Sequence, residues 1–194
     1  MTAARPQLWV VGGPNGAGKT TLVSRRIARR IPVINPDAIA DGLPLVSGAR
    51  DERQAGALAL ERRAELLRSG ESFAIETTLT GASPLRFISE AKQAGYKVTL
   101  VFVGLDDNDL SIQRVADRVG KGGHSVPVSA LVRRYPASLD AFVKAVRVVD
   151  RAYLFDNSGA RRRLLAAIED GRIRYQARDL PDWARRSLAG LPPI

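Results

Sequence analysis

One stretch of eight residues near the N-terminus constrains this chain more than any other. It reads Gly13-Pro14-Asn15-Gly16-Ala17-Gly18-Lys19-Thr20 and matches the pattern G-x-x-x-x-G-K-[ST]. The apolar run Leu8–Val11 before it predicts a buried strand, and Thr21–Arg30 after it predicts a helix with one apolar face. A glycine-rich turn between strand and helix directs backbone N–H groups and the positive end of the helix dipole at an anion. The stretch therefore predicts a binding site for the phosphates of a nucleoside triphosphate.

The loop positions have separate expected roles. Glycines let a phosphate approach the backbone and adopt φ values that a Cβ disfavours. We expect Lys19 to reach the β- and γ-phosphates and the Thr20 hydroxyl to hold Mg²⁺, with ATP or GTP as the nucleotide. The predicted nucleotide-binding residues are Gly13, Pro14, Asn15, Gly16, Ala17, Gly18, Lys19, Thr20 and Thr21.

Length and composition set broad limits. With 194 residues, 45% of them hydrophobic, we expect a single domain over residues 1–194 with a proper core. The absence of cysteine excludes disulfides and thiolate metal sites, and it fits a reducing cytoplasm. No apolar run approaches the ~20 residues of a membrane span, and Met1–Arg5 lacks the apolar core of a signal peptide. We therefore expect a soluble, intracellular protein.

The chain is strongly basic, with a net charge of +10 from 30 Lys and Arg against 20 Asp and Glu. A basic surface attracts nucleic acid, nucleotides or an acidic protein. Much of the excess lies between Arg161 and Arg186. A solvated arginine-rich surface explains that late cluster equally well.

Strand-like and helix-like segments alternate along most of the chain. Predicted strands cover residues 32–34, 72–75, 96–103 and 152–155, and predicted helices cover 49–69, 83–94, 109–119 and 138–149, with a loop over 41–48. This alternation predicts an α/β fold: the three-layer P-loop kinase fold, with a central parallel sheet covered on both faces. Asp170-Gly171 predicts a hairpin of residues 163–168 and 172–175, which a short helix over 181–188 follows.

Acidic residues follow several of these strands. Ligands bind at the carboxyl ends of strands in open parallel sheets. There Asp37 could accept a proton from a substrate hydroxyl, cap a helix, or do both. Glu76 could act through the Mg²⁺ shell, accept a hydrogen bond from a substrate hydroxyl, or be a surface residue. Asp106-Asp107 is either a Walker-B-like acidic pair or a turn before the next helix.

Arginines flank a second glycine-rich segment, Gly120–Pro127. Arg114 and Arg118 precede it, and Arg133 and Arg134 follow it. This arrangement predicts a mobile lid that excludes water and brings arginines to the transferred phosphoryl group. An ordinary surface loop is the alternative. His124, the only histidine, cannot build a metal site alone, and we interpret it as a lid turn residue.

Taken together, these motifs resemble the zeta-toxin family of P-loop kinases. The resemblance covers the core over residues 7–158; the C-terminal segment 159–194 lies outside it. It rests on Gly13–Thr20, Asn35-Pro36-Asp37, Phe73–Thr78 and the lid with its arginines. It implies transfer of phosphate from ATP or GTP to a hydroxyl of a small acceptor. In the toxins proper the acceptor is UDP-N-acetylglucosamine, and an acidic antitoxin protein blocks the nucleotide site.

The resemblance also implies roles for individual residues. Implied catalytic residues are Lys19, Asp37, Arg118 and one of Arg133 or Arg134, and implied acceptor-binding residues are Asp37, Glu76, Thr77 and Thr78. The chain departs from the toxins in two ways: it is shorter, and Asn35 stands where they usually have Asp.

Two other classes of function fit parts of the pattern. A nucleic-acid-binding ATPase or polynucleotide kinase would use the +10 charge, although the aromatic residues are few and scattered. A non-catalytic nucleotide switch would need neither the general base Asp37 nor paired lid arginines.

Overall fold

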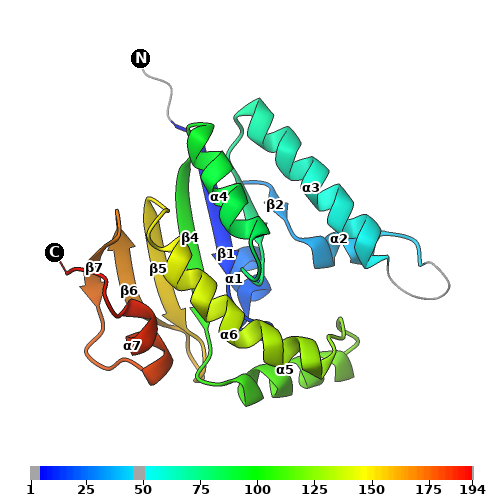
Figure 1. Ribbon diagram of the computed structural model, residues 1–194. Coiled ribbons are helices and arrows are strands. Elements are labelled where there is room, and N and C mark those ends of the chain that lie inside the picture. Colours follow the sequence, from blue (N-terminus) through cyan, green and yellow to red (C-terminus); the bar gives the residue numbers. More distant parts are fainter. Residues whose placement is uncertain (1–4, 46–50, 194) are drawn as a thin grey trace.

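A single seven-stranded sheet runs through the molecule (Figure 1). The computed structural model describes residues 5–45 and 51–193. The strand order is β2-β3-β1-β4-β5-β6-β7. The strands are β1 Gln7–Gly12, β2 Val33–Ile34, β3 Phe73–Glu76, β4 Lys97–Gly104, β5 Arg151–Asp156, β6 Arg163–Glu169 and β7 Arg172–Gln176. The helices are α1 Lys19–Arg26, α2 Pro36–Gly42, α3 Glu52–Ser69, α4 Ser83–Gln93, α5 Asn108–Gly120, α6 Val128–Ala145 and α7 Asp182–Leu188.

The first five strands of the chain are parallel to one another. β1 pairs in parallel with β3 and β4, β3 pairs with β2, and β4 pairs with β5. Their carboxyl ends therefore lie along one edge of the sheet, where the segments after Gly12, Ile34 and Glu76 meet. This confirms the predicted central parallel sheet of an α/β fold.

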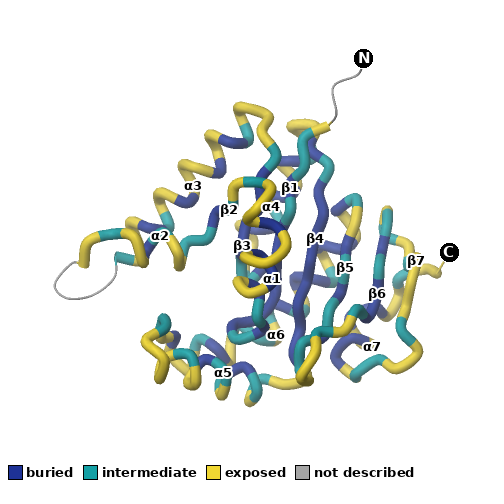
Figure 2. The backbone as a smooth tube through the Cα atoms, turned by 180° about the vertical axis from the view of Figure 1, so that it is seen from behind, coloured by how far each residue is buried: buried dark blue, intermediate teal, exposed yellow. Residues whose placement is uncertain are grey.

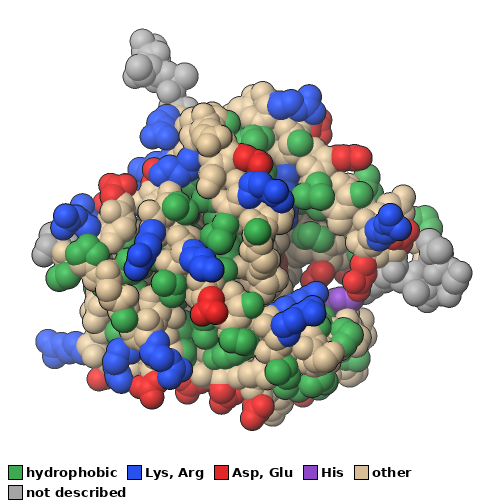
Figure 3. Space-filling model, viewed as in Figure 1, with side chains coloured by type: hydrophobic (Ala, Val, Ile, Leu, Met, Phe, Trp, Pro, Cys, Tyr) green, Lys and Arg blue, Asp and Glu red, His purple; other side chains and the backbone are tan. Residues whose placement is uncertain are grey.

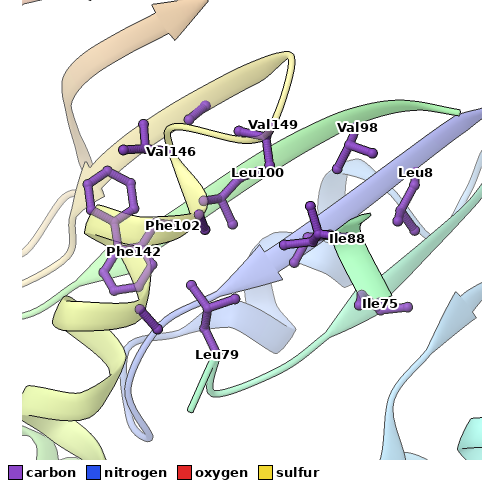
Figure 4. Close-up of a cluster of buried hydrophobic side chains, with 14 of the residues drawn as sticks. Leu8, Ile75, Leu79, Ile88, Val98, Leu100, Phe102, Phe142, Val146 and Val149 are labelled. Carbon is purple, nitrogen blue, oxygen red and sulfur yellow. The ribbon is translucent and has the colours of Figure 1, made fainter. Parts of the chain in front are cut away.

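Helices cover both faces of the sheet with separate hydrophobic clusters. On one face, side chains of α3, α4, α6 and α7 pack on the strands, as with Ile88 and Phe142 against Leu100 and Phe102 (Figure 4). On the other face, Leu22, Val23 and Ile27 of α1 pack against the sheet. The central strands are buried along nearly their whole length (Figure 2). This burial explains why their sequences are continuously apolar.

The C-terminal hairpin extends this sheet. β6 pairs antiparallel with β5, and β7 pairs antiparallel with β6. Helix α7 follows the hairpin, and its Trp183 packs on Gly104 of β4. A Cβ at Gly104 would lie 2.2 Å from the indole ring. Beyond α7, the N–H of Ile173 in β7 donates to the carbonyl of Pro192 at 3.0 Å, and Ile173 forms a bridge with Pro193.

Some element boundaries differ from the sequence-based prediction. The predicted loop over 41–48 is partly helical, since α2 extends to Gly42; residues 46–50, including the predicted start of a helix at 49, lie outside the described residues. α1 ends at Arg26 and not at Arg30. The helix predicted from 138 begins at Val128 and continues through Pro136. Proline disfavours a helix interior, but packing of Leu131 and Phe142 outweighs that local preference. No helix among the described residues combines the length and apolarity of a bilayer span.

Candidate active site

The loop between β1 and α1 depends on its glycines. Gly13 has φ 139°, and a Cβ there would lie 2.1 Å from the carbonyl oxygen of Val103. Gly16 and Gly18 also have positive φ, and a Cβ at Gly18 would lie 2.7 Å from the Asn157 side chain. The Asn157 amide in turn donates to the carbonyl of Ala17 at 2.9 Å. The loop is therefore held tightly from both sides, in a backbone shape that other residues could not adopt.

Lys19 is buried at the start of α1. Its side chain is 8% exposed, and its Nζ donates to the carbonyl of Pro14 at 2.8 Å. Burial lowers the pKa of Lys19 to about 8, against the opposing effect of the nearby Glu76 and Asp37 charges. A bound phosphate would add negative charge beside Lys19 and so favour the charged form of its amine.

A chain of hydrogen bonds joins the phosphate loop to the segment after β2. The Thr20 hydroxyl donates to Glu76 Oε1 at 2.6 Å, and the Asn35 amide donates to Glu76 Oε2 at 2.9 Å. The Oδ1 of Asn35 accepts from the backbone N–H of Asp37 at 2.9 Å. Asn35, and not Asp37, thus caps α2, with Pro36 in the first turn. Glu76 fixes both Thr20 and the segment that carries Asp37.

The environment of Glu76 fits a divalent cation. Glu76 is 8% exposed, and burial raises the pKa of its carboxyl group, against the hydrogen bond from Thr20 and the charge of Lys19. Mg²⁺ binds hard oxygen ligands, commonly one or two carboxylates together with substrate phosphates. The Thr20 hydroxyl and the Glu76 carboxylate are such ligands. The described residues contain no cluster of three or more His, Asp or Glu side chains suited to a metal.

The phosphate loop, Asp37 and the lid face one cleft of about 430 Å³. Figure 3 shows it as a hollow with acidic side chains and the histidine at its edge. Asp37 is exposed to this cleft, and Thr77 and Thr78 line it. Further lining residues are Asn15, Gly16, Gly18, Lys19, Thr20, Thr21, Glu76, Arg114, Arg118, His124 and Arg134.

The two adjacent arginines of α6 differ in position. Arg134 lines the cleft, whereas Arg133 is exposed and does not line it. Arg118 of α5 lines the cleft, and Arg114 holds the loop after β5 by donating to the carbonyls of Asn157 and Ser158 at 2.7 and 3.0 Å. Of the four arginines that flank the lid, Arg114, Arg118 and Arg134 therefore line the cleft, and Arg133 does not.

The lid segment lies across the cleft. Arg118 donates to the carbonyl of His124 at 2.7 Å, and a Cβ at Gly123 would lie 2.5 Å from the Arg118 side chain. The His124 Nε2 lies 3.4 Å from Oε1 of Glu52 at the start of α3. The lid thus connects α5 with α3, and His124 makes a contact across the cleft that sequence reasoning did not anticipate.

The acidic pair Asp106-Asp107 after β4 does not have the Walker-B-like role that was one of its two interpretations. Asp106 and Asp107 are both exposed, and neither lines the cleft. The Asp107 side chain accepts from the Leu110 N–H at 2.7 Å and caps α5. The alternative interpretation, a turn and helix cap, is therefore correct. Arg63 of α3 also lines the cleft, and sequence reasoning missed it.

Comparison with protein families decides the family. The zeta toxin family model matches residues 1–163. The chain belongs to the zeta-toxin family. A relative from Haemophilus influenzae, described as an uncharacterized protein, is 29% identical over 138 residues, which cover 68% of this chain and 99% of the relative.

Solved structures share the fold. The AvrRxo1-ORF1:AvrRxo1-ORF2 structure with sulphate ions has a TM-score of 0.69 at 19% identity and covers 88% of this zeta-toxin family chain. This chain spans 61% of that structure's length. The PezAT toxin–antitoxin system of Streptococcus pneumoniae has a TM-score of 0.61 at 19% identity and covers 99% of this chain and 80% of its own. A structure of AvrRxo1-ORF1:-ORF2 with ATP has a TM-score of 0.64 at 17% identity, and the match covers 95% of this chain and 63% of that one.

Proposed function

We propose that this chain is a phosphotransferase that moves the γ-phosphate of ATP or GTP to a hydroxyl of a small acceptor, with a UDP-sugar such as UDP-N-acetylglucosamine as the first candidate. One observation carries the proposal. The hydrogen-bonded chain Thr20–Glu76–Asn35 links the phosphate loop to the backbone N–H of Asp37, whose carboxylate is exposed to the same cleft. A protein that only bound nucleotide would not need that carboxylate.

Each residue has a defined part in this reaction. Asp37 accepts the proton of the acceptor hydroxyl while the acceptor oxygen bonds to the γ-phosphorus and the bond to the β-phosphate oxygen breaks. Lys19, Arg118 and Arg134 stabilise the charge on the transferred group. Mg²⁺, held by Thr20 and the Glu76 region, would neutralise charge on the β- and γ-phosphates. Thr77 and Thr78 line the cleft where the acceptor would bind.

An acidic antitoxin is the proposed protein partner. Two of the similar solved structures are toxin–antitoxin or two-protein complexes by their titles, PezAT and AvrRxo1-ORF1:-ORF2. The net charge of +10 favours an acidic partner. In this proposal the antitoxin blocks access of the nucleotide to the cleft.

The test is phosphate transfer to defined acceptors. Purified protein is incubated with Mg²⁺, γ-labelled ATP or GTP, and a panel of UDP-sugars, and labelled products are separated. We expect labelled sugar nucleotide with the wild-type chain and far less with Asp37→Asn. Label appearing only as inorganic phosphate, whatever the acceptor, would indicate an ATPase and contradict the proposal.

A second function, binding of single-stranded nucleic acid, is favoured by one surface feature. Trp9, Tyr153 and Phe155 line a groove of about 990 Å³ on the α1 face of the sheet. Its other lining residues include the arginines Arg25, Arg26, Arg30, Arg161 and Arg162. The fold thus gathers aromatic residues that are scattered in the sequence. Aromatic rings beside arginines are typical of single-strand binding. Affinity for an oligonucleotide that falls steeply with salt, and that Trp9→Ala weakens, would support this function.

A further inference from the structure

Helix α3 carries an arginine on its buried face. Its buried residues are Ala55, Ala59, Arg63 and Leu66, spaced by four, four and three positions, so they share one side of the helix. Arg63 is 9% exposed, and its guanidinium lies 5.6 Å from the centre of the Phe87 ring. Arginine is rarely buried to this extent unless it is paired.

The charge of Arg63 has no acidic partner in the described part of the chain. It makes no hydrogen bond or ion pair there, and its Nε is buried without an acceptor. Burial lowers the pKa of Arg63, and no acidic group opposes that effect. The Phe87 ring attracts the cation but does not accept all of its N–H groups. The neighbouring Arg62, by contrast, is half-exposed and pairs with Glu65. The fold therefore leaves the guanidinium of Arg63 with free donors.

Arg63 lies at the wall of the cleft of the candidate active site. Arg63 lines the same cleft as Asp37, Thr77 and Thr78. Helix α3 packs beside α2, which carries Asp37 (Figure 1). Since Gly13–Thr20 would take the donor phosphates, Arg63, on the helix beside the one that carries Asp37, is left for the acceptor.

We propose that Arg63 binds an oxyanion, a phosphate or a carboxylate, carried by the acceptor molecule. This inference rests on the proposed function, because it assigns a substrate class to the same cleft. A guanidinium presents paired N–H groups that match two oxygens of a phosphate or carboxylate. Without ligand, the buried charge is uncompensated; an acceptor anion removes that penalty. The enzyme then selects acidic hydroxyl compounds, sugar nucleotides among them, over neutral sugars.

A binding experiment tests the oxyanion site without any turnover. The full chain is saturated with a non-hydrolysable ATP analogue and Mg²⁺, and inorganic phosphate is titrated in by calorimetry. We expect Arg63→Gln to weaken phosphate binding by roughly 10- to 100-fold, the range for a hydrogen bond to a charged group. Arg62→Gln, on the adjacent exposed arginine, should bind phosphate as the wild type does. No phosphate binding by the wild type, or equal binding by Arg63→Gln, would overturn the proposal.

A turnover experiment identifies the kind of anion. The acceptors are N-acetylglucosamine, its 1-phosphate and glucuronate, which are neutral, phosphorylated and carboxylated. We expect Arg63→Gln to raise the KM of one charged acceptor by at least about tenfold while kcat/KM for the neutral sugar stays the same. An equal fall for charged and neutral sugars would mean a structural role and overturn the proposal. Should no acceptor be phosphorylated while phosphate still binds through Arg63, the kinase function fails and the oxyanion site stands.

Folding is monitored independently. Circular dichroism and affinity for the ATP analogue are measured for each variant. If Arg63→Gln does not fold, Arg63→Lys, which keeps the charge but not the paired donors, serves in both experiments. Arg63→Lys should retain part of the preference for the charged acceptor. If the variant folds but shows no such preference, the result would count against a role for the charge.

Discussion

The Thr20 hydroxyl donates a 2.6 Å hydrogen bond to the buried carboxylate of Glu76. The same carboxylate accepts from Asn35, whose side chain caps the helix that carries Asp37. The phosphate loop and the proposed general base are therefore joined through one acidic side chain. A displacement of Glu76 would affect both at once, because neither Thr20 nor Asn35 has another side-chain partner of this kind among the described residues.

Asn35→Asp should destabilise the protein at neutral pH. Asn35 donates to Glu76 at 2.9 Å, and an ionised aspartate cannot donate. Two carboxylates at this distance would raise the pKa of Glu76 further. A carboxyl group whose pKa is higher in the folded than in the unfolded protein stabilises the fold fully at low pH. That stabilisation is lost as the pH rises through the folded-state pKa. We expect a loss of about 1–3 kcal/mol in the free energy of unfolding at pH 7 and much less at pH 4.5. Urea unfolding at both pH values measures it; an equal loss at both would exclude the charge explanation.

Nucleotide binding should take up a proton at alkaline pH. The pKa of Lys19 is about 8 in the free protein, because burial disfavours its charged form. Bound phosphates favour the charged form, so above pH 8 binding restores up to one proton to Lys19, and affinity falls as pH rises. Calorimetry with an ATP analogue in buffers of different ionisation enthalpy measures the uptake. Lys19→Met should abolish it and weaken binding; wild-type affinity in that variant would contradict the phosphate-binding role of Lys19.

Asp37→Asn should preserve nucleotide binding and lower turnover. The amide keeps the size of the side chain but cannot accept the hydroxyl proton, and general-base catalysis contributes ~10²–10⁴-fold. The backbone N–H of Asp37, which binds Asn35, is unaffected by the change. Steady-state kinetics at saturating acceptor gives kcat, and an ATP-analogue titration gives Kd. A fall in kcat of less than about threefold, with chemistry rate-limiting, would remove Asp37 as the base.

The two arginines of α6 should differ in their effect on turnover. Arg134 lines the cleft and Arg133 does not. Arg134→Ala and Arg118→Ala should each lower kcat by roughly 10²-fold or more while nucleotide Kd changes little, since their contacts strengthen in the transition state. Arg133→Ala is the matched control and should be close to wild type. A reversed order of Arg133 and Arg134 would show that the lid closes with a different face of α6 toward the phosphates.

The sequence predicted much of the fold because the relevant signals are local. The spacing of Gly13–Thr20 alone predicts the loop. Because ligands bind at the carboxyl ends of parallel strands, the position of Glu76 at the end of a predicted strand places it near that loop. Arg133 and Arg134 could not be separated, because adjacent helical residues point about 100° apart and the helix start before Pro136 was unknown. Arg63 was missed because an arginine in a helix normally indicates a solvated face. Its place in the stripe of Ala55, Ala59 and Leu66 was the available signal.

Both edges of the sheet are closed to further strands. β2, at one edge, is only two residues long. At the other edge, β7 carries Arg172 and Arg174. The segment Pro192-Pro193 lies against Ile173 of this strand. Proline has no N–H to offer a neighbouring strand, and short or positively charged edges resist pairing with another molecule. We therefore expect the sheet to resist edge-to-edge aggregation, and removal of the last few residues to make the chain prone to self-association at high concentration.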